Sequence, residues 1–519
     1  MSGAGSARPF DAAGRAASLA DLGRDPVDVL VIGGGITGAG VALEAARRGH
    51  GVGLVEARDF GAGTSSRSSK LIHGGIRYLA QGEVGLVREA LRERSRLRRE
   101  FPEMVEPISF LLPIPRNLKD AVLLKAGLTT YDLLARGGGF PRHRRIGVEA
   151  ARRMAPALRR SDIRGAWVYW DAQTDDARLT LAVIRRAAAR GALAANHAEV
   201  VVTRSVAAGW EVDVRDTLSG ARITARCRWL VNAAGVWADS VEALAGRSPR
   251  THLRPSKGVH LTFSRADLPV DTALVFPVGD GRVLFAIPWH GHVVVGTTDT
   301  DYGGDIAAPA CEPAEAADVL AAVNRFFGLA LNPGAVLSRW AGVRPLIATG
   351  RQAATKDLSR KPFIEMDERG LLTVTGGKLT TFMAMAEAAV DRLPAPAGAA
   401  GGPGVGLAPT REALVAADPA LAARLSERHP YTLADIALAC DAEMALELDD
   451  ALNRRLRLAF LDVGAALEAA PAAAAVMAAR LGWRDTEARL QGYRELLARE
   501  FGAAADRPLP GALLSAGRR

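Results

Sequence analysis

The N-terminal part of the chain has a hydrophobic pattern that predicts a strand, a helix and a second strand. Residues 27–32 (Val-Asp-Val-Leu-Val-Ile) are a short apolar run of strand length, and an Ala-rich helical stretch follows at 39–48. Residues 51–55 (Gly-Val-Gly-Leu-Val) are typical of a second buried strand. Apolar runs of strand length on either side of a helical stretch predict a βαβ unit with parallel strands.

The rest of the pattern predicts further strands, helices and one linker. The segments that we expect are a Ser- and Gly-rich loop (64–80), a charged helix (83–100), an amphipathic helix (117–136), an antiparallel sheet within 200–300 that is interrupted by the apolar strand 229–232, and a strand (371–375) that leads into a helix. The Pro-, Gly- and Ala-rich stretch 393–409 predicts a linker, and a helical segment follows at 410–503.

The composition is that of a globular protein. With 519 residues, the chain has room for about three folding units. A hydrophobic content of 49% and a charged content of 24% exclude wholesale disorder. No run of about 18 uncharged apolar residues is present, so we expect no helix that spans a bilayer. The segment 1–26 lacks the apolar core of a signal peptide.

The cysteines and the charges limit the metal sites, cellular locations and binding partners that we expect. Cys227, Cys311 and Cys440 are too far apart for metal-ligand spacing or a disulfide framework, so we expect no metal site and a reducing, cytoplasmic location. The formal net charge is +9, which suits an anionic partner such as a membrane surface, a nucleic acid or an acidic substrate. No nucleic-acid motif accompanies the charge. Because 59 of the 66 basic residues are Arg, a single Arg carries less information than one of the seven Lys.

A dinucleotide-binding fingerprint follows the first strand. Gly33, Gly35 and Gly38 have G-x-G-x-x-G spacing, and Glu56 comes eighteen residues after the last of them. The glycines permit a tight turn, close approach of backbone to a pyrophosphate, and close helix–strand packing. A carboxylate such as Glu56 accepts hydrogen bonds from ribose hydroxyls and repels a 2′-phosphate, which disfavours NADP.

Two later segments favour FAD over NAD. The strand 229–232 runs into Ala-Ala-Gly235, and the strand 371–375 runs into Gly376-Gly377-Lys378. A buried flavin needs contacts along its whole length, and small residues let backbone approach it. A helix that starts after Gly377 would also place its positive end near the reduced flavin, which accumulates negative charge.

Residues 63–79 (Gly-Thr-Ser-Ser-Arg-Ser-Ser-Lys-Leu-Ile-His-Gly-Gly-Ile-Arg-Tyr-Leu) closely resemble the signature of FAD-dependent glycerol-3-phosphate dehydrogenases. Further segments resemble that family in the same order, namely Asp175-Asp-Ala-Arg-Leu179, Ser256-Lys-Gly-Val-His260, Gly296-Thr-Thr-Asp299, Trp340-Ala-Gly-Val-Arg-Pro-Leu346, Thr375-Gly-Gly-Lys-Leu-Thr-Thr381 and the tail around 449–462. The resemblance covers nearly the whole chain after residue 25. It implies a buried FAD that oxidises glycerol 3-phosphate to dihydroxyacetone phosphate and passes electrons to membrane quinone.

The resemblance also implies roles for individual residues. The family's FAD contacts correspond to Gly33, Gly35, Gly38, Glu56, Ser65, Ser66, Ser69, Lys70, Leu71 and Gly377. The residues that the family places around the substrate correspond to Arg77, Tyr78, His260, Thr297, Arg344, Arg360 and Lys378. The chain departs from the family at Phe382-Met-Ala-Met385, where a Tyr and basic residues are common. This departure bears on the packing beside the flavin.

The implied substrate is consistent with the residues themselves. A phosphate dianion needs several fixed cations, and Arg344, Arg360 and Lys378 supply three, with Arg77 as a further candidate. Charge-assisted hydrogen bonds of this kind contribute about 1.5–3 kcal/mol each. Oxidation of the alcohol needs a base, and a neutral His takes a proton at pH 7. His260 is our first choice and His73 the alternative, while Arg344 would lower the pKa of the hydroxyl group.

The segment 117–136 raises the question of a membrane surface. Its apolar positions alternate with Lys119, Lys125 and Arg136, a pattern that fits a helix in the membrane interface or a helix packed on its own domain. Together with the resemblance it leads us to expect a peripheral enzyme on the inner face of the cell membrane. The sequence leaves open a homodimer, an oxygen-using glycerol-3-phosphate or amino-acid oxidase, and a non-catalytic FAD-bound scaffold.

We therefore expect a mixed α/β fold of the glutathione-reductase-like type. A Rossmann-type FAD-binding domain carries an inserted antiparallel-sheet substrate domain, and an all-helical domain follows. The expected ranges are 25–110, 165–250 and 340–392 for the FAD-binding domain, 111–164 and 251–339 for the substrate domain, 393–409 for the linker and 410–519 for the helical domain.

Overall fold

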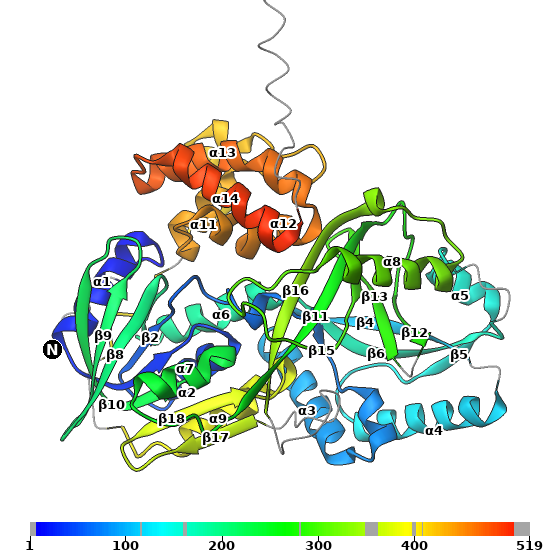
Figure 1. Ribbon diagram of the computed structural model, residues 1–519, viewed down its shortest axis with the longest axis horizontal. Coiled ribbons are helices and arrows are strands. Elements are labelled where there is room, and N and C mark those ends of the chain that lie inside the picture. Colours follow the sequence, from blue (N-terminus) through cyan, green and yellow to red (C-terminus); the bar gives the residue numbers. More distant parts are fainter. Residues whose placement is uncertain are drawn as a thin grey trace, which may run out of the picture.

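The computed structural model confirms the expected fold class, with two β-sheets and a group of C-terminal helices (Figure 1). The structure describes residues 7–114, 117–158, 163–279, 282–347, 362–396, 401–406 and 408–502. Arg360, which we expect at the substrate, lies outside the described residues.

The first sheet is the Rossmann-type sheet that the sequence predicts. Its five parallel strands run in the order β18, β10, β1, β2, β7, and β17 adds an antiparallel edge next to β18. The N-terminal part of β10 also pairs with β9, which pairs with β8. The strands are β1 (Val27–Ile32), β2 (Val52–Val55), β7 (Leu193–Ala195), β8 (Ala198–Val206), β9 (Gly209–Asp216), β10 (Arg222–Asn232), β17 (Pro362–Met366) and β18 (Leu371–Gly376).

Both faces of this sheet are covered, which explains why all six residues of β1 are buried. Val29 and Val31 belong to the core under the helices α2, α6 and α9, whereas Leu30 belongs to the opposite core, which includes residues of α1 and β9. Alternate residues of a strand face opposite sides, so a strand covered on both sides is apolar throughout. The helices are α1 (Ala12–Arg24), α2 (Ile36–Arg47), α6 (Asp176–Ala188), α7 (Ala238–Leu244) and α9 (Phe382–Val390).

The second sheet is largely antiparallel and has ten strands. Its order is β15, β11, β14, β13, β12, β4, β6, β3, with β16 also paired to β11 and β5 to β6. The strands are β3 (Leu71–Ile72), β4 (Val105–Pro113), β5 (Arg144–Ile146), β6 (Ala166–Thr174), β11 (Leu253–Ser264), β12 (Ala273–Gly279), β13 (Arg282–Trp289), β14 (His292–Gly296), β15 (Thr300–Asp301) and β16 (Val336–Ile347). Its helices are α3 (Val84–Glu100), α4 (Leu118–Leu134), α5 (Val148–Met154) and α8 (Pro313–Phe327).

Strand pairing differs from the sequence expectation in two respects. The β-rich segment 200–300 does not form one sheet, because β8, β9 and β10 join the first sheet and β11 to β15 join the second. The strand β6, which falls in our expected FAD-binding range, pairs with β4 in the second sheet. Alternation of apolar and polar residues predicts a strand but not the strand with which it pairs. Pairing between strands that are distant in sequence is therefore determined by the tertiary structure.

The C-terminal helices lie over the junction of the two sheets (Figure 1). They are α10 (Arg411–Ala417), α11 (Leu433–Glu443), α12 (Leu458–Leu461), α13 (Val463–Leu481) and α14 (Thr486–Phe501), with a π-helical turn at Asp450–Arg455. Within the described residues, α13 is long and apolar enough to cross a bilayer by length and composition. Its Ala-rich face, however, is buried in the core shared with α11 and α14, and a core helix meets the same criteria.

Candidate active site

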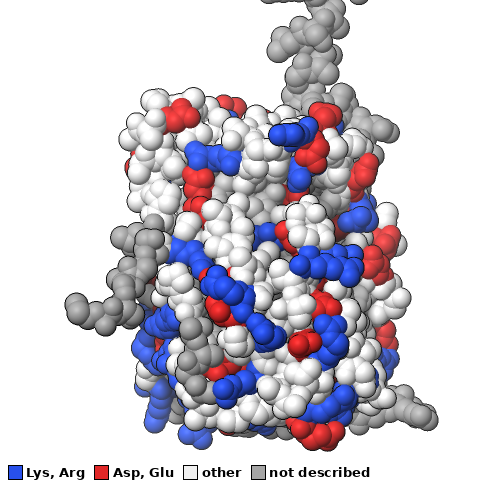
Figure 2. Space-filling model, turned by 90° about the vertical axis from the view of Figure 1, so that its left-hand side faces the viewer, with Lys and Arg blue, Asp and Glu red and all other residues white. Residues whose placement is uncertain are grey.

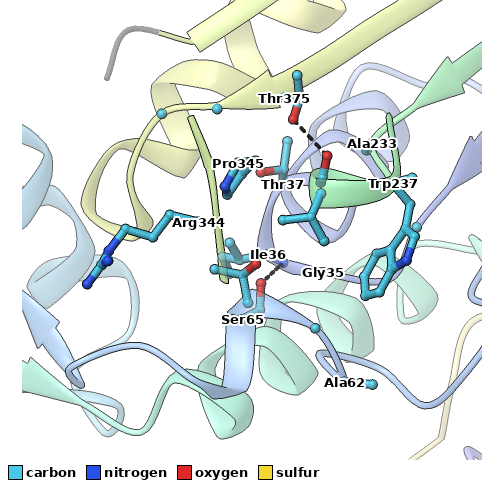
Figure 3. A pocket seen from close by; sticks show the side chains of 18 of the residues that line it. Gly35, Ile36, Thr37, Ala62, Ser65, Ala233, Trp237, Arg344, Pro345 and Thr375 are labelled. Atoms are coloured by element: carbon cyan, nitrogen blue, oxygen red, sulfur yellow. Dashed lines mark hydrogen bonds between the residues drawn. The ribbon is translucent and has the colours of Figure 1, made fainter. Parts of the chain in front are cut away.

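A cavity of about 690 Å³ lies where the first sheet meets β16 of the second. Its walls come from the carboxyl ends of β1, β2 and β18, from the segment 62–73, and from Arg344 and Pro345. Figure 3 shows Trp237 and Arg344 on opposite sides of this cavity, with the start of α2 between them. Ligands of open α/β sheets bind at this edge, beyond the carboxyl ends of the parallel strands.

One end of the cavity has the geometry of a dinucleotide cradle. Gly33 has a φ of +109°, and a Cβ atom on Gly38 would lie 1.9 Å from the carbonyl oxygen of Gly33. The helix α2 therefore packs closely on β1 and points its N-terminus into the cavity, where it favours negative charge. Glu56 accepts a hydrogen bond of 2.7 Å from the Gly34 amide, and Ser65 Oγ accepts one of 2.9 Å from the Ile36 amide (Figure 3).

The segment 63–72, which we call the flavin loop, divides into residues that line the cavity and residues that anchor the loop. Ser65, Ser69 and Leu71 line the cavity. Ser66 is buried and does not line it. The Lys70 side chain is also buried away from the cavity, 2.8 Å from an Asp176 carboxylate oxygen and 2.6 Å from the Ser66 carbonyl oxygen. Burial lowers the pKa of Lys70 to about 7, against the opposing effect of the Asp176 carboxylate.

The C-terminal helices also hold the flavin loop. Arg457 donates a hydrogen bond of 2.7 Å to the Ser66 carbonyl and one of 3.1 Å to Asp176. Arg67 forms a buried ion pair with Glu500 of α14. The loop at the cavity is therefore fixed from behind by charged groups that lie more than 380 positions later in the chain.

The other end of the cavity carries basic groups. Gly376 and Gly377 have φ values of +75° and +71°, which glycine adopts without strain. They are followed by Lys378, whose Nζ lies 3.9 Å from the centre of the Tyr78 ring. The amide of His73, the residue that follows the flavin loop, donates a hydrogen bond of 3.1 Å to Thr380 Oγ1 at the start of this helical segment.

Arg344 is held in place by a neighbouring strand end. Its Nη2 donates a hydrogen bond of 2.8 Å to Thr297 Oγ1, and its Nη1 donates one of 3.2 Å to the Thr298 carbonyl. Gly258 lies directly beside this pair, because a Cβ atom there would be 2.3 Å from Thr297 Oγ1 and 2.4 Å from Arg344 Nη2. The glycine at position 258 thus leaves room for the guanidinium group.

His260 lies behind the cavity wall. It is 2% exposed, and its ring stacks on Trp340 with centres 4.1 Å apart and planes at 13°. Its Nε2 lies 3.0 Å from Ser69 Oγ, and its Nδ1 has no hydrogen-bond partner in the described part of the chain. Burial, with the nearby charges of Lys70 and Arg344, holds the pKa of His260 well below its ordinary value. The imidazole is therefore neutral at pH 7.

The structure brings most of the expected site residues together. The expected residues that line the cavity are Gly33, Gly35, Glu56, Ser65, Ser69, Leu71, Tyr78, Arg344, Gly377 and Lys378. Thr297 and His260 stand behind Arg344 and Ser69. Arg77, in contrast, is exposed on the short helix Ile76–Gln81 and does not line the cavity. His73, our alternative base, does line it.

Some site residues were not anticipated from the sequence. Trp237 lines the cavity, and Trp340 stacks on His260. Asp176 and Arg457 anchor the flavin loop. Asp176 lies in a segment that resembles the known family, so its position carried a signal. Arg457 is one of 59 arginines, but it lies within the tail around 449–462, which also resembles the family, so its position carried the same signal.

Comparison with known proteins agrees with this geometry. Residues 28–392 match the family model of FAD-dependent oxidoreductases, and residues 410–488 match that of the C-terminal domain of alpha-glycerophosphate oxidase. A Mycobacterium bovis protein named glycerol-3-phosphate dehydrogenase 2 is 38% identical over 90% of this chain and 87% of its own length. The chain belongs to the family of FAD-dependent glycerol-3-phosphate dehydrogenases.

Two further members of this family extend the comparison. The aerobic glycerol-3-phosphate dehydrogenase of Bacillus subtilis is 37% identical over 74% of this chain and 69% of its own. The crystal structure of the Bacillus halodurans enzyme complexed with FAD has a TM-score of 0.72, at 28% identity over 95% of this chain and 98% of that chain. FAD is the cofactor of this flavoenzyme family. The cradle at Gly33–Gly38, with Glu56 beside it, fits the adenosine diphosphate part of that cofactor.

Proposed function

We propose that this chain oxidises sn-glycerol 3-phosphate to dihydroxyacetone phosphate and passes the electrons to a membrane quinone. The observation that carries the proposal is the position of Arg344 and Lys378, which line the same cavity as the glycine cradle. The names of the relatives, glycerol-3-phosphate dehydrogenases from several bacteria, support the same substrate.

The charge at the cavity fits a phosphate better than an amino acid. Arg344 presents a planar group that binds two oxygens at once, and Lys378 adds a second positive charge. An amino-acid oxidase needs only one carboxylate clamp, together with an apolar side-chain pocket. Arg360 would add a third cation in our proposal, although it lies outside the described residues.

The proposed reaction also needs a group that takes the hydroxyl proton. Bound FAD would supply the acceptor for the hydride of the alcohol carbon. In our proposal the neutral imidazole of His260 is the base that takes the proton. The Ser69 hydroxyl connects this imidazole to the cavity wall. Arg344 stabilises the negative charge that develops on the substrate oxygen as the proton leaves.

The visible spectrum of the purified protein tests the substrate. Under anaerobic conditions, glycerol 3-phosphate should bleach the oxidised-flavin band, whereas glycerol and D-amino acids should leave it unchanged. A flavin band that none of these compounds changes would contradict the reaction and favour a non-catalytic FAD-bound scaffold. Bleaching by a D-amino acid would favour an amino-acid oxidase.

The acceptor is tested on the reduced protein. Reoxidation by a short-chain quinone should be at least tenfold faster than reoxidation by air-saturated buffer. If oxygen reoxidises the flavin as fast as the quinone does, with stoichiometric hydrogen peroxide, the chain is an oxidase.

The surface of α4 supports a peripheral membrane location in our proposal. Leu118 and Leu123 are 77% and 65% exposed, and Val122 and Leu133 on the same helix are also exposed. Lys119, Lys125 and Arg136 lie among or beside them, and this combination suits an interface with anionic lipid. The helix projects at one end of the molecule, whereas basic and acidic side chains are interspersed on the opposite side (Figures 1 and 2).

Vesicle flotation tests the proposed surface. The double variant Leu118→Gln with Leu123→Gln should lose at least tenfold in binding to phosphatidylglycerol vesicles, because it removes exposed apolar area without changing charge. A matched control is Leu218→Gln with Leu244→Gln, two other exposed leucines, of which one lies in the turn between β9 and β10 and one at the end of α7. Equal binding by both variants would place the lipid contact elsewhere.

A further inference from the structure

A second, smaller cavity lies at the C-terminal end of α4. It has a volume of about 130 Å³ and is lined by residues of α3, α4, the loop 136–142 and β6. Within the described chain, it shares no lining residue with the larger cavity. Nothing in the proposed reaction uses it.

Arg94 forms the inner wall of this small cavity. Its side chain is fully buried, and its Nη1 donates hydrogen bonds of 2.6 Å to Asp171 and 2.9 Å to the Trp170 carbonyl. Its Nε and Nη2 have no hydrogen-bond partner in the described part of the protein. A buried guanidinium with two unused donors is costly unless an acceptor enters the cavity.

The mouth of the cavity carries further positive charge. Arg136 and Arg142 both line it, and both are exposed. Between them runs the loop Gly137-Gly138-Gly139, in which the first and last residues have φ values of +79° and +72°. A Cβ atom on Gly138 would lie 2.4 Å from Ser95 Oγ, so this loop packs tightly on α3.

The acidic groups nearby are already engaged. Asp132 lines the cavity, but its carboxylate accepts a hydrogen bond of 2.9 Å from the amide of His143 and lies 2.6 Å from Nδ1 of the same residue. Asp171 accepts hydrogen bonds from Arg94, from the Tyr131 hydroxyl at 2.8 Å and from the Gly74 amide at 3.2 Å. Three arginines thus line a space in which Asp132 is bound to His143, and Asp171, behind the wall, is paired with Arg94 through Nη1 alone.

We propose that this small cavity binds a phosphate group. The guanidinium group of one arginine can bind two phosphate oxygens at once. A buried arginine with two further arginines at the entrance therefore suits a phosphate dianion. The group could belong to a free phosphate ester or to a phospholipid headgroup. The lipid source rests on the membrane-facing surface proposed for α4, because the exposed Leu133 lies on the last turn of that helix. The phosphate chemistry itself does not depend on that surface or on the oxidation of glycerol 3-phosphate.

A pair of charge-matched variants tests this proposal. Arg136→Gln with Arg142→Gln changes two exposed arginines that line the cavity, and Arg144→Gln with Arg145→Gln changes two exposed neighbours on β5 that do not. Both variants lose the same charge from the same region, and both leave the Arg94–Asp171 ion pair intact for folding. The probes are inorganic phosphate, measured by calorimetry on the FAD-loaded protein, and phosphatidylglycerol vesicles, measured by flotation.

The first variant should lose one phosphate site, with an affinity at least tenfold weaker, while the second keeps the affinity of the parent. Phosphate binding at the larger cavity is the same in both variants, so it does not affect the difference between them. Arg136 also belongs to the proposed α4 surface, so the source is a lipid headgroup only if vesicle binding falls selectively in the first variant and inorganic phosphate also displaces the parent protein from vesicles. If vesicle binding is unchanged, or falls without such displacement, the source is a free phosphate ester. Identical phosphate binding by the two variants would overturn the proposal, and an equal loss of vesicle binding would then indicate diffuse surface charge. Turnover of glycerol 3-phosphate, measured on the same samples, reports separately on the proposed function.

Discussion

Ser69 Oγ lies 3.0 Å from Nε2 of His260, and this contact connects the cavity wall to a buried imidazole. His260 itself does not line the cavity, whereas Ser69 does. The ring is fixed by stacking on Trp340, so its position relative to Ser69 is set by packing on the far side. In the proposed reaction, Ser69 is therefore the group that would connect His260 to a bound substrate.

Removal of this hydroxyl should slow the reaction. Ser69→Ala should lower kcat by about 10- to 100-fold, a part of the ~10²–10⁴-fold that a positioned acid–base group supplies. The FAD content should stay that of the parent, because Ser65 and the glycine cradle are untouched. Steady-state kinetics and the flavin spectrum check both points, with the exposed Ser205→Ala as a control. A kcat within twofold of the parent would show that the proton leaves by another group, with His73 the first candidate.

The activity should persist into mild acid. The pKa of His260 lies well below its ordinary value, chiefly because the ring is buried. A base is lost as the pH falls through its pKa, so the acidic limb of kcat/KM should lie below pH 6.5. A pH profile measured with saturating quinone checks this. An acidic limb between pH 6.5 and 8 that Ser69→Ala leaves in place would assign the base to a different group.

Gly258 should be needed to keep the Arg344 guanidinium group in the position that binds substrate. Gly258→Ala places a methyl group 2.3 Å from Thr297 Oγ1 and 2.4 Å from Arg344 Nη2, so the guanidinium has to move. Loss of one charge-assisted hydrogen bond costs about 1.5–3 kcal/mol, which is roughly a 10- to 150-fold rise in KM. The flavin spectrum should not change. Gly303→Ala is the matched control, since no atom lies within 4 Å of its added methyl group; the same KM in both variants would argue against a role of Arg344 in binding substrate.

Glu500 should stabilise the flavin loop. Glu500→Gln leaves the buried Arg67 without its counter-charge, and breaking a buried ion pair costs about 3–5 kcal/mol. We expect lower stability to urea and faster release of FAD on dilution, followed by flavin fluorescence. Glu495→Gln, an exposed change on the same helix, is the control. A loss of stability with unchanged FAD release would show that this ion pair stabilises the C-terminal helices but does not hold the flavin loop.

His197 should make stability fall at alkaline pH. Burial alone lowers the pKa of His197, but the carboxylate of Asp450 and its acidic neighbours outweigh this and raise the pKa to about 8. Because the folded pKa is above the unfolded value of about 6.5, the contribution is complete below pH 6.5 and is lost as the pH rises through 8. The loss is about 2 kcal/mol for a shift of ~1.5 units.

Urea unfolding at pH 6.5 and pH 9 checks this contribution of His197. Other groups titrate in the same range, so the relevant quantity is the difference between the parent and His197→Gln. The parent should lose about 2 kcal/mol more than the variant between the two pH values. Equal losses in the two proteins would show that the ion pair with Asp450 contributes nothing to folding.

The sequence by itself determined the features that depend on neighbouring residues. The glycine spacing at Gly33–Gly38, the buried strand before it and Glu56 at the end of the next strand act within one βαβ unit, so their order along the chain is their order in space. The same holds for Gly376 and Gly377 at the end of β18, whose positive φ values only glycine adopts readily.

Only the tertiary structure decided which distant groups meet. Lys70 and Arg77 lie in one motif, yet the first is buried against Asp176 and the second faces solvent, because the turn between them and the packing behind it orient each side chain separately. The contact of Ser69 with His260 spans 191 positions, and that of Ser66 with Arg457 spans 391. Hydrophobic periodicity predicts which face of a helix or strand is buried, but not which other element covers that face. The contacts of Ser69 and Ser66 therefore depend on how the sheets and the C-terminal helices pack.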